Sequence, residues 1–362
     1  MFPKLVIGDW VIKVPIIQGG MGVKISGPKL ASAVANEDGV GVLAGPDIGA
    51  DEPDFFTNPT NANVRALRKA IEEARRLTTG FGYLGVNVMV ALKDFAILVQ
   101  TAIEEGVDFI FCGAGIAKDL PVFLKNGAKT KLIPIVSSGR LAGIIAKAWF
   151  EKYGYIIPAV VVEGPKAGGH LGFNEESLND PEYSLEKLIP QVVDVLRLFR
   201  EKYKIDIKIP AIAAGGIYTG EDIYRIMQLG ASGVQMATRF VTTEECDADD
   251  KFKMTYINAK SKEDLIIIKS PVGMPGRAIR NKFLEAVAEG KRVPNKCTFH
   301  CLKTCKPQEA PYCISLALIN AYRGKLEGGF AFAGENAWRA EKIISVRQLI
   351  ETLKEEYENV FR

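Results

Sequence analysis

Eight short apolar runs, rich in β-branched residues, recur along roughly the first 240 residues and are separated by amphipathic stretches. The runs are apolar throughout instead of alternating, which is expected of parallel strands whose two faces are both covered. Eight strand and helix units in a stretch of this length match an α/β fold of the TIM (β/α)8 barrel type. Periodicity does not show closure, so a doubly wound sheet is the rival fold. The expected strands span residues 15–19, 39–44, 83–89, 108–113, 131–137, 157–164, 209–215 and 232–238.

Helical periodicity accounts for the stretches between these strands. Apolar positions recur on one face of each stretch, and several end at a glycine, as helices commonly do. Thr219, followed three residues later by Asp222, resembles a capping box at the start of the last of them. The expected helices span residues 63–77, 93–105, 139–153, 185–202 and 220–229.

The chain is longer than a barrel alone requires. With 362 residues, 48% of them apolar, it can bury a large core and carry an addition. We expect a barrel over residues 1–242, a smaller and mainly helical cap over residues 243–332, and a segment over residues 333–362 that returns to the barrel. Within that last segment, residues 345–357 carry an apolar stripe, which predicts a final helix packed on the barrel.

Charge and cysteine content restrict the class of partner. The formal net charge is +3 and basic residues are interspersed with acidic ones, so the sequence has no nucleic-acid footprint. No apolar run approaches the ~20 residues that span a bilayer, and the N-terminus lacks the pattern of a signal peptide. We therefore expect a cytoplasmic protein that acts on a small molecule, with neither nucleic acid nor a membrane as partner. Six cysteines in a chain of this size do not suggest a secreted disulfide scaffold.

In a TIM barrel the chemistry gathers at the C-terminal ends of the strands, and the loops after strands 7 and 8 commonly hold phosphate. After the seventh expected strand, Gly215 and Gly216 expose backbone N–H groups that suit an anion. The sequence has neither a Walker pattern nor a GxGxxG after its first strand, which excludes a P-loop and an ordinary dinucleotide fold. The eighth strand faces the same anion with its last residues, Gln235, Met236, Ala237 and Thr238.

His170 is one of only two histidines and lies in the glycine-rich run VVVEGPKAGGHLGF, residues 160–173. The run begins as a buried strand end, and its glycines let the backbone approach a ligand closely beside one imidazole. A lone histidine in a glycine turn is more often structural than catalytic. The glycine-rich ends of three other strands favour catalysis here, so His170 is the candidate catalytic residue.

Four cysteines gather near the C-terminus, and three of them are spaced every four residues. If residues 296–306 were helical, Pro307 would end the helix and these three thiols would form one stripe. Such a stripe, with His300 nearby, suits a metal ion or an iron–sulfur cluster, although it matches neither usual signature well. The alternatives are a redox-active group and reduced thiols in a packing face. The four residues are Cys297, Cys301, Cys305 and Cys313.

Several of these motifs together resemble the FMN-dependent nitronate monooxygenases, formerly called 2-nitropropane dioxygenases, and their relatives, the FMN-dependent enoyl-acyl carrier protein reductases. The resemblance covers most of the chain, and its motifs occur in the right order. They are PIIQGGMG (15–22), GVNVM (85–89), EGPKAGGHLG (163–172), IPAIAAGGI (209–217), GASGVQMATRF (230–240), PGRAIRN (275–281) and GGFAFAGENA (328–337).

The resemblance implies FMN as cofactor and gives residues their roles by position. Gly216 and the run from Gln235 to Thr238 would hold the FMN phosphate. The histidine of the AGGH motif, which is the catalytic base or polarising group in the monooxygenases, is His170. The residues that would touch or flank the flavin itself are Gly20, Met21, Asn87, Glu163 and Gly168.

The implied reaction is the oxidation of alkyl nitronates or nitroalkanes with molecular oxygen. It requires a base of near-neutral pKa and an electron acceptor beside the substrate carbanion, and His170 and FMN meet these needs. An enoyl-acyl carrier protein reductase that uses NAD(P)H in the same pocket is the alternative. A flavin-binding redox sensor, based on the cysteine group, is a second alternative, and a homodimer is left open.

Three residues depart from the monooxygenase pattern. Glu163 stands where the monooxygenases usually have Gln and the reductases have Glu, and Glu335 replaces another Gln. Ala237 replaces a Gly, which predicts either a backbone φ below zero at this residue or a changed approach of the phosphate.

Overall fold

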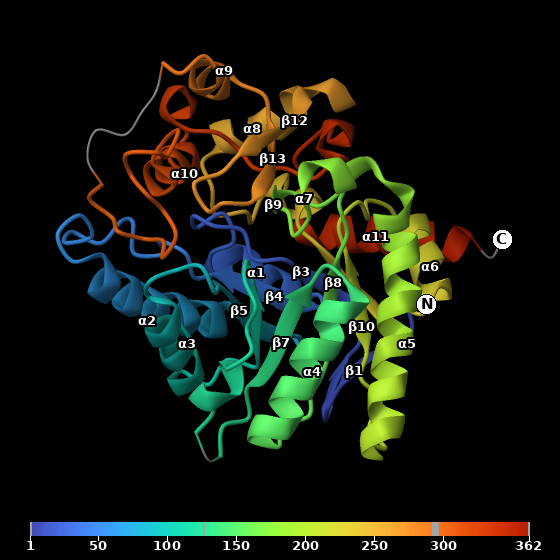
Figure 1. Ribbon diagram of the computed structural model, residues 1–362. Coiled ribbons are helices and arrows are strands. Elements are labelled where there is room, and N and C mark those ends of the chain that lie inside the picture. The colour runs from blue at the N-terminus through green and yellow to red at the C-terminus, as the bar shows by residue number, and fades with distance from the viewer. Residues whose placement is uncertain (1, 126, 292–296, 361–362) are drawn as a thin grey trace.

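The computed structural model describes residues 2–125, 127–291 and 297–360, and its centre is a closed barrel of parallel strands (Figure 1). The barrel strands are β3 (Ile16–Gln18), β4 (Val40–Ala44), β5 (Tyr83–Met89), β6 (Phe109–Gly113), β7 (Lys131–Val136), β8 (Val160–Glu163), β10 (Ala211–Ala214) and β11 (Gly233–Met236). They are the eight strands that the apolar runs predict. From β3 to β8 they are neighbours in chain order, and β10 and β11 complete the ring. The predicted barrel is therefore confirmed, and the doubly wound sheet is wrong.

Helices cover the outside of this barrel (Figure 1). The five expected helices all form, and Thr219 and Asp222 make the predicted capping box. A short 3₁₀ turn, Leu120–Phe123, replaces a helix between β6 and β7. In the part of the chain that the structure describes, no helix combines the length and the apolar character needed to cross a membrane. The bounds are α1 Pro28–Asn36, α2 Pro59–Leu77, α3 Phe95–Glu104, α4 Gly139–Tyr153, α5 Leu185–Tyr203, α6 Gly220–Gln228 and α11 Val346–Asn359.

The last of these, α11, is the predicted final helix. It packs against α6, where a methyl group added to Gly220 would come 2.3 Å from the Leu353 carbonyl oxygen. The residues of its apolar stripe, Val346, Leu349, Ile350 and Leu353, are fully buried.

Alternation along the strands divides the core into two layers. Phe109 and Phe111 of β6 point into the barrel and meet Ile133 and Val161 from the next two strands. Ile110, between the two phenylalanines, packs outward in the layer that the helices cover. The barrel is thus filled by side chains and is not a channel.

A hairpin that the apolar runs did not predict closes the N-terminal end of the barrel. Its strands are β1 (Leu5–Ile7) and β2 (Trp10–Ile12), which pair antiparallel. Leu5, Ile7 and Ile12 join the inner cluster and are fully buried. Because this end is closed, a site inside the barrel is left with the C-terminal strand ends.

Helix α1 was not expected, and its N-terminus is stabilised by a residue far along the chain. Gly27 precedes the helix and has no side chain to cap it. The Asp247 carboxylate instead accepts hydrogen bonds from the N–H groups of Gly27 (2.9 Å), Lys29 (3.2 Å) and Leu30 (3.1 Å). A negative charge at a helix N-terminus also interacts favourably with the helix dipole.

A cap covers the C-terminal ends of the barrel strands, at the top of Figure 1. It follows the short helix α7 (Thr238–Val241) and contains, among its described residues, three helices and one hairpin. The hairpin was not predicted, and the boundaries at residues 242 and 332 stay predictions. The elements are α8 (Asp250–Asn258), β12 (Leu265–Lys269), β13 (Pro275–Ile279), α9 (Lys282–Ala288) and α10 (Ile314–Tyr322).

The helix considered for residues 296–306 does not form from Cys297 onward, and Lys296 lies outside the described residues. The segment instead runs beside the loop after β5. The Lys93 N–H donates to the Cys301 carbonyl and the Lys303 N–H donates to the Ala91 carbonyl, both at 2.9 Å. Because these backbone bonds replace those of a helix, the three thiols do not share a helical face.

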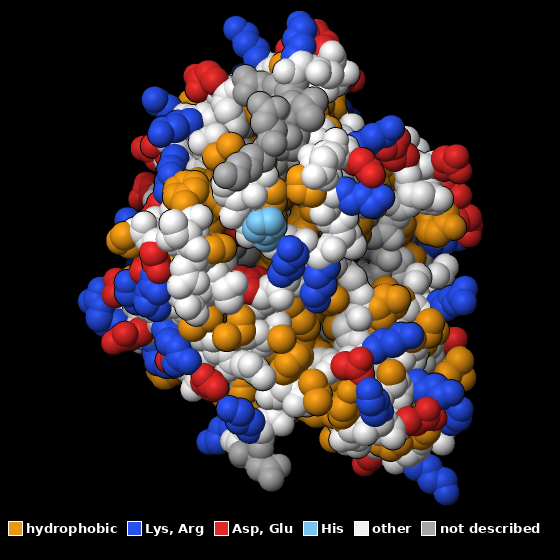
Figure 2. Space-filling model, turned by 60° about the vertical axis from the view of Figure 1, so that its left-hand side comes forward, with side chains coloured by type: hydrophobic (Ala, Val, Ile, Leu, Met, Phe, Trp, Pro, Cys, Tyr) orange, Lys and Arg blue, Asp and Glu red, His pale blue; other side chains and the backbone are white. Residues whose placement is uncertain are grey.

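Lysine, arginine and acidic side chains are mixed over the face of the molecule in Figure 2. Many of them form exposed ion pairs, such as Arg68 with Glu104 (2.8 Å) and Glu105 (2.6 Å). Exposed pairs of this kind contribute little to stability. The stability of the fold therefore comes mainly from the buried core layers and the helix-capping interactions.

Removing the Asp247 carboxyl should destabilise the protein through α1. In Asp247→Ala three N–H groups lose their acceptor, and we expect the free energy of unfolding to fall by about 1–3 kcal/mol. Asp247→Asn keeps one side-chain oxygen and should lose less. Chemical denaturation followed by circular dichroism measures both variants, and equal stability of Asp247→Ala and the unchanged protein would contradict the long-range cap.

Candidate active site

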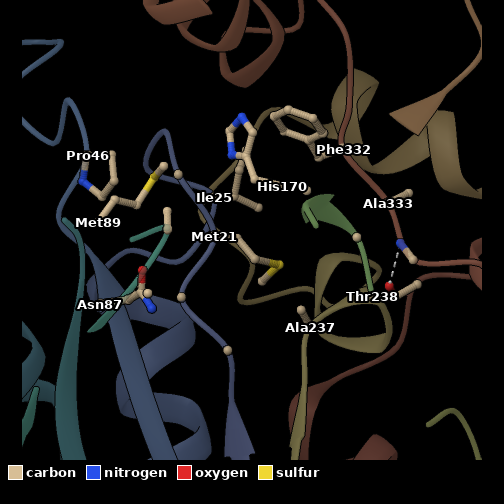
Figure 3. Close-up of a pocket in the computed structure, with 18 of the residues that line it drawn as sticks. Met21, Ile25, Pro46, Asn87, Met89, His170, Ala237, Thr238, Phe332 and Ala333 are labelled. Carbon is tan, nitrogen blue, oxygen red and sulfur yellow. Dashed lines mark hydrogen bonds between the residues drawn. The ribbon is translucent and has the colours of Figure 1, made fainter. Parts of the chain in front are cut away.

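A cavity opens between the C-terminal strand ends and the cap (Figure 3). Its empty volume, with the mouth included, is about 1230 Å³. The cavity brings together most of the residues that the sequence singled out: Gly20, Met21, Asn87, Glu163, Gly168, His170, Gln235, Ala237 and Thr238.

Three polar side chains form the floor of this cavity. Asn87 of β5, Glu163 of β8 and Gln235 of β11 all lie on the inner side of their strands and line the cavity. The residues just before them, such as Val86 and Val162, pack outward in the layer under the helices. The polar floor therefore follows directly from strand alternation at the upper rim of the barrel.

Bare backbone forms much of the cavity wall. A methyl group added to Gly20 would come 2.4 Å from Asn87 Cβ, and one added to Gly168 would come 2.5 Å from the Ala333 carbonyl carbon. Packing within the protein therefore requires both glycines. At these two positions the main chain itself lines the cavity.

Three of the predicted residues do not line the cavity. The Met236 side chain packs outward in the core. Gly215 and Gly216 both have positive φ, and the Gly216 carbonyl accepts a hydrogen bond from Asn336 Nδ2 at 2.8 Å. Gly216 is thus bonded to the segment that returns from the cap.

The eighth strand end meets that returning segment directly. Thr238 Oγ1 accepts a hydrogen bond from the Gly334 N–H at 3.1 Å, drawn as the dashed line in Figure 3. Ala237 has a φ of −124°, so the negative φ predicted as one outcome of its methyl group is confirmed. The Glu335 side chain, which departs from the family pattern, lies 3.5 Å from the Lys166 ammonium.

His170 lies on the cap side of the cavity, across from Asn87 and Ala237 (Figure 3). Its Nε2 is hydrogen-bonded to Ser270 Oγ at 2.7 Å, and its ring meets the Phe332 ring with centroids 4.9 Å apart. Burial lowers the pKa of the imidazole from its usual value of 6.5 to about 4. The sequence-based expectation was a base of near-neutral pKa. In the structure the pKa of His170 is lower, so its imidazole is neutral over the physiological pH range.

Antiparallel pairing with the cap holds His170 in place. Strand β9 (Gly169–His170) pairs with β13, so that His170 lies opposite Gly276 and Gly169 opposite Arg277. Sequence analysis did not identify Ser270 or Arg277, since neither carries a local signal of its role. An arginine inside the apolar run PGRAI was the one available hint.

Arg277 fixes the loop that leads from β8 to His170. Its guanidinium is buried and donates to the carbonyl oxygens of Pro165 (2.6 Å) and Ala167 (2.7 Å). Charge-assisted hydrogen bonds to two carbonyls two residues apart define the path of the backbone. Arg277 is thus a positioning residue for the loop.

Glu163 is another titratable group of the site with a large shift in pKa. Burial raises the pKa of its carboxyl from 4.5 to about 8. His170 and Glu163 shift in opposite directions for the same reason, because burial disfavours the charged form of each. At pH 7 the cavity therefore presents a neutral imidazole and a neutral carboxylic acid.

The cysteine group does not support the metal or iron–sulfur interpretation. Among the residues that the structure describes, no set of three or more His, Cys, Asp or Glu side chains is placed to hold a metal ion. Burial raises the pKa of Cys301 to about 12 and also raises the pKa of Cys305 and Cys313. Cys301 and Cys313 pack against a cluster that contains Phe55 and Phe299. They are thiols in a packing face, which was the alternative interpretation.

Comparison with known proteins agrees with this geometry. The family model described as nitronate monooxygenase matches residues 4–356. The chain belongs to the nitronate monooxygenase family. It is 29% identical over 314 residues to a probable nitronate monooxygenase from Staphylococcus aureus, a match that covers 77% of this chain and 78% of that protein. The chain is therefore an oxidoreductase.

Two further relatives carry different names. An indene-carboxyl-CoA dehydrogenase from Mycobacterium tuberculosis is 29% identical over 281 residues, which cover 78% of this chain and 67% of that protein. The structure of FabK from Thermotoga maritima is similar, with a TM-score of 0.74 and 29% identity over 97% of this chain and 94% of that chain. The family thus supports an FMN-type oxidoreductase but leaves its substrate open.

The low pKa of His170 can be measured directly. Because the folded-state pKa of about 4 lies below the usual 6.5, the imidazole should remain neutral at pH 5, where an exposed imidazole is mostly protonated. Nitrogen-detected NMR of the imidazole rings between pH 7.5 and 5 tests this, and His170→Gln identifies the His170 signals. A midpoint near pH 6.5 would contradict the burial that the structure gives this side chain.

Proposed function

We propose that the protein is an FMN-dependent oxidoreductase that oxidises alkyl nitronates with molecular oxygen. The observation that carries this proposal is a neutral imidazole, His170, held by Ser270 across the cavity from a wall of bare backbone. When bound, FMN supplies the acceptor for the electron pair of the substrate carbanion and passes electrons to oxygen. The protein is expected to work in the cytoplasm, and a homodimer stays a prediction.

The residues of the cavity fit the flavin by their chemistry. Gly20 and Gly168 present main chain to the cavity, which a flat ring could approach closely, and Asn87 offers an amide that can donate or accept. The phosphate would lie near Thr238 and Gly216, where backbone groups of two loops converge. These assignments follow the family motifs.

His170 would act on the substrate. A base whose conjugate acid has a pKa of about 4 is a weak acceptor for the proton of a carbon acid. The site therefore favours substrates that arrive already ionised as nitronates over neutral nitroalkanes. Towards a nitronate, the neutral imidazole hydrogen-bonds and orients the substrate, and the Phe332 ring beside it excludes water.

An enoyl thioester reductase is the second candidate function. The likeness to FabK, the CoA dehydrogenase relative and the glutamate at position 163 favour it. In that reaction NAD(P)H would be the reductant, and the same pocket would receive the thioester. The flavin-binding sensor is not proposed, because Cys301 and Cys313, on which it rested in part, are half-buried thiols packed against an apolar cluster, and burial raises the pKa of both.

Rapid mixing distinguishes the two enzymes. We expect propyl nitronate to bleach the flavin absorbance of the FMN-loaded protein in anaerobic stopped-flow experiments, and NADH and NADPH to leave it unchanged over the same time. Nitronates give electrons to the flavin, whereas a reductase takes them from nicotinamide. The opposite pattern selects the reductase, and bleaching by neither reagent excludes both reactions.

Substitution of His170 should affect the oxidation of the nitronate through the loss of one hydrogen bond. In His170→Ala, kcat/KM for the pre-ionised nitronate should fall about 10-fold, since the imidazole no longer orients the substrate. Turnover of a neutral nitroalkane should be slow in the unchanged protein and in the variant, because an imidazole of lowered pKa is a weak base. FMN content, measured by absorbance, should stay unchanged. Steady-state oxygen consumption is the assay, and unchanged turnover of the nitronate would remove His170 from catalysis.

A further inference from the structure

Glu163 is the last residue of β8, and its side chain is turned toward the inside of the barrel. Val161, two residues earlier, belongs to the inner cluster, whereas Val160 and Val162 pack outward. Alternation along the strand therefore places Glu163 on the inner face, where it lines the cavity.

Nothing in the described part of the chain compensates a charge on this carboxyl. The neighbouring strands contribute Ile135 from β7 and Ala214 from β10, both apolar. Among the described residues, Glu163 has neither an ion pair nor a side-chain hydrogen bond, and burial alone acts on its pKa. The side chain is half-buried in the cavity, and a ligand bound there would cover it further. An ionised carboxylate covered without a partner is costly, so this environment favours the protonated form.

The charged groups of the adjacent loop have other partners. The Lys166 ammonium lies 3.5 Å from the Glu335 carboxylate. The Arg277 guanidinium donates to two backbone carbonyls of the loop after β8. Neither cation is therefore directed at Glu163.

The other titratable groups that line the cavity are also neutral. His170 is uncharged at pH 7 because burial lowers its pKa. The Tyr256 hydroxyl donates to the Phe332 carbonyl, and burial raises its pKa further above the usual range. Thus no charged side chain shifts the pKa of Glu163.

We propose that Glu163 meets the flavin as a neutral carboxylic acid and donates its O–H to an acceptor atom of the ring. This inference rests on the proposed function, since it requires FMN in the cavity. Glutamine at this position donates through its amide but cannot ionise, whereas glutamate makes the hydrogen bond depend on pH. Glu163 would thereby make cofactor retention sensitive to alkaline pH.

The direction of this dependence follows from the pKa of about 8. Below that pH the carboxyl keeps its proton and can donate it to a hydrogen bond. Above it the carboxylate has no proton to donate and repels the phosphorylated cofactor. If only the neutral form binds well, FMN affinity falls ~10-fold per pH unit above pH 8, or about 30-fold between pH 7 and pH 9.5.

The test is FMN binding by the apoprotein, followed by quenching of flavin fluorescence between pH 6.5 and 9.5. For the unchanged protein we expect the Kd to rise about 30-fold by pH 9.5. Glu163→Gln should change less than about threefold over the same range, because its donor does not titrate. Glu163→Leu removes the donor and should bind about 5- to 10-fold more weakly than Glu163→Gln at pH 7, since one hydrogen bond is lost.

Glu176→Gln is the control, because it removes an exposed carboxyl outside the cavity and should keep the pH profile of the unchanged protein. Circular dichroism at each pH checks that all four proteins remain folded. Identical pH profiles for the unchanged protein and Glu163→Gln would overturn this inference and leave the proposed function intact. Equal affinity of Glu163→Leu and Glu163→Gln at pH 7 would do the same. Failure of the folded, unchanged protein to bind FMN at any pH would overturn both.

Discussion

Closure of the eight-stranded parallel barrel is the constraint on which the site depends. Phe109 and Phe111 fill the interior, and the hairpin of β1 and β2 closes the N-terminal end. A ligand can therefore enter only at the C-terminal rim, where the inward residues change from apolar to polar. The polar side chains at this rim are the last inward ones of their strands, or close to the last. They are Asn87, Glu163 and Gln235. Strand alternation thus determines both which side chains fill the barrel and which side chains line the cavity.

The second constraint is the sheet that joins the cap to the barrel. Strand β9 is only two residues long and has no stability of its own. Its pairing with β13 and the bonds from Arg277 to the preceding loop give the His170 backbone one position. Ser270, which lies between β12 and β13, then fixes the imidazole ring. The cap thus does more than cover the cavity, because it supplies the contacts that orient the candidate catalytic residue.

Sequence patterns predicted what depends on neighbours along the chain and missed what depends on distant partners. The eight barrel strands, the Thr219 capping box and α11 follow from local periodicity and capping residues. Helix α1 was missed because its cap, Asp247, is 220 residues away. The cysteine segment was misjudged because backbone bonds to the loop after β5 replace its helix. Most cavity residues could be found by family motifs, but Ser270 and Arg277 act only through the folded cap.

The protonation states of His170 and Glu163 have a common origin and a common consequence. Both groups are neutral at pH 7 because the cavity disfavours charge, although one pKa is lowered and the other raised. An anionic substrate in such a cavity must be stabilised by hydrogen-bond donors, since Lys166 and Arg277 are engaged elsewhere. Neutral His170 can donate to a substrate without adding a charge, as protonated Glu163 can to the flavin. Under the proposed function His170 would serve a nitronate or an enoyl thioester alike, so the choice between the two reactions would lie with the electron donor and acceptor.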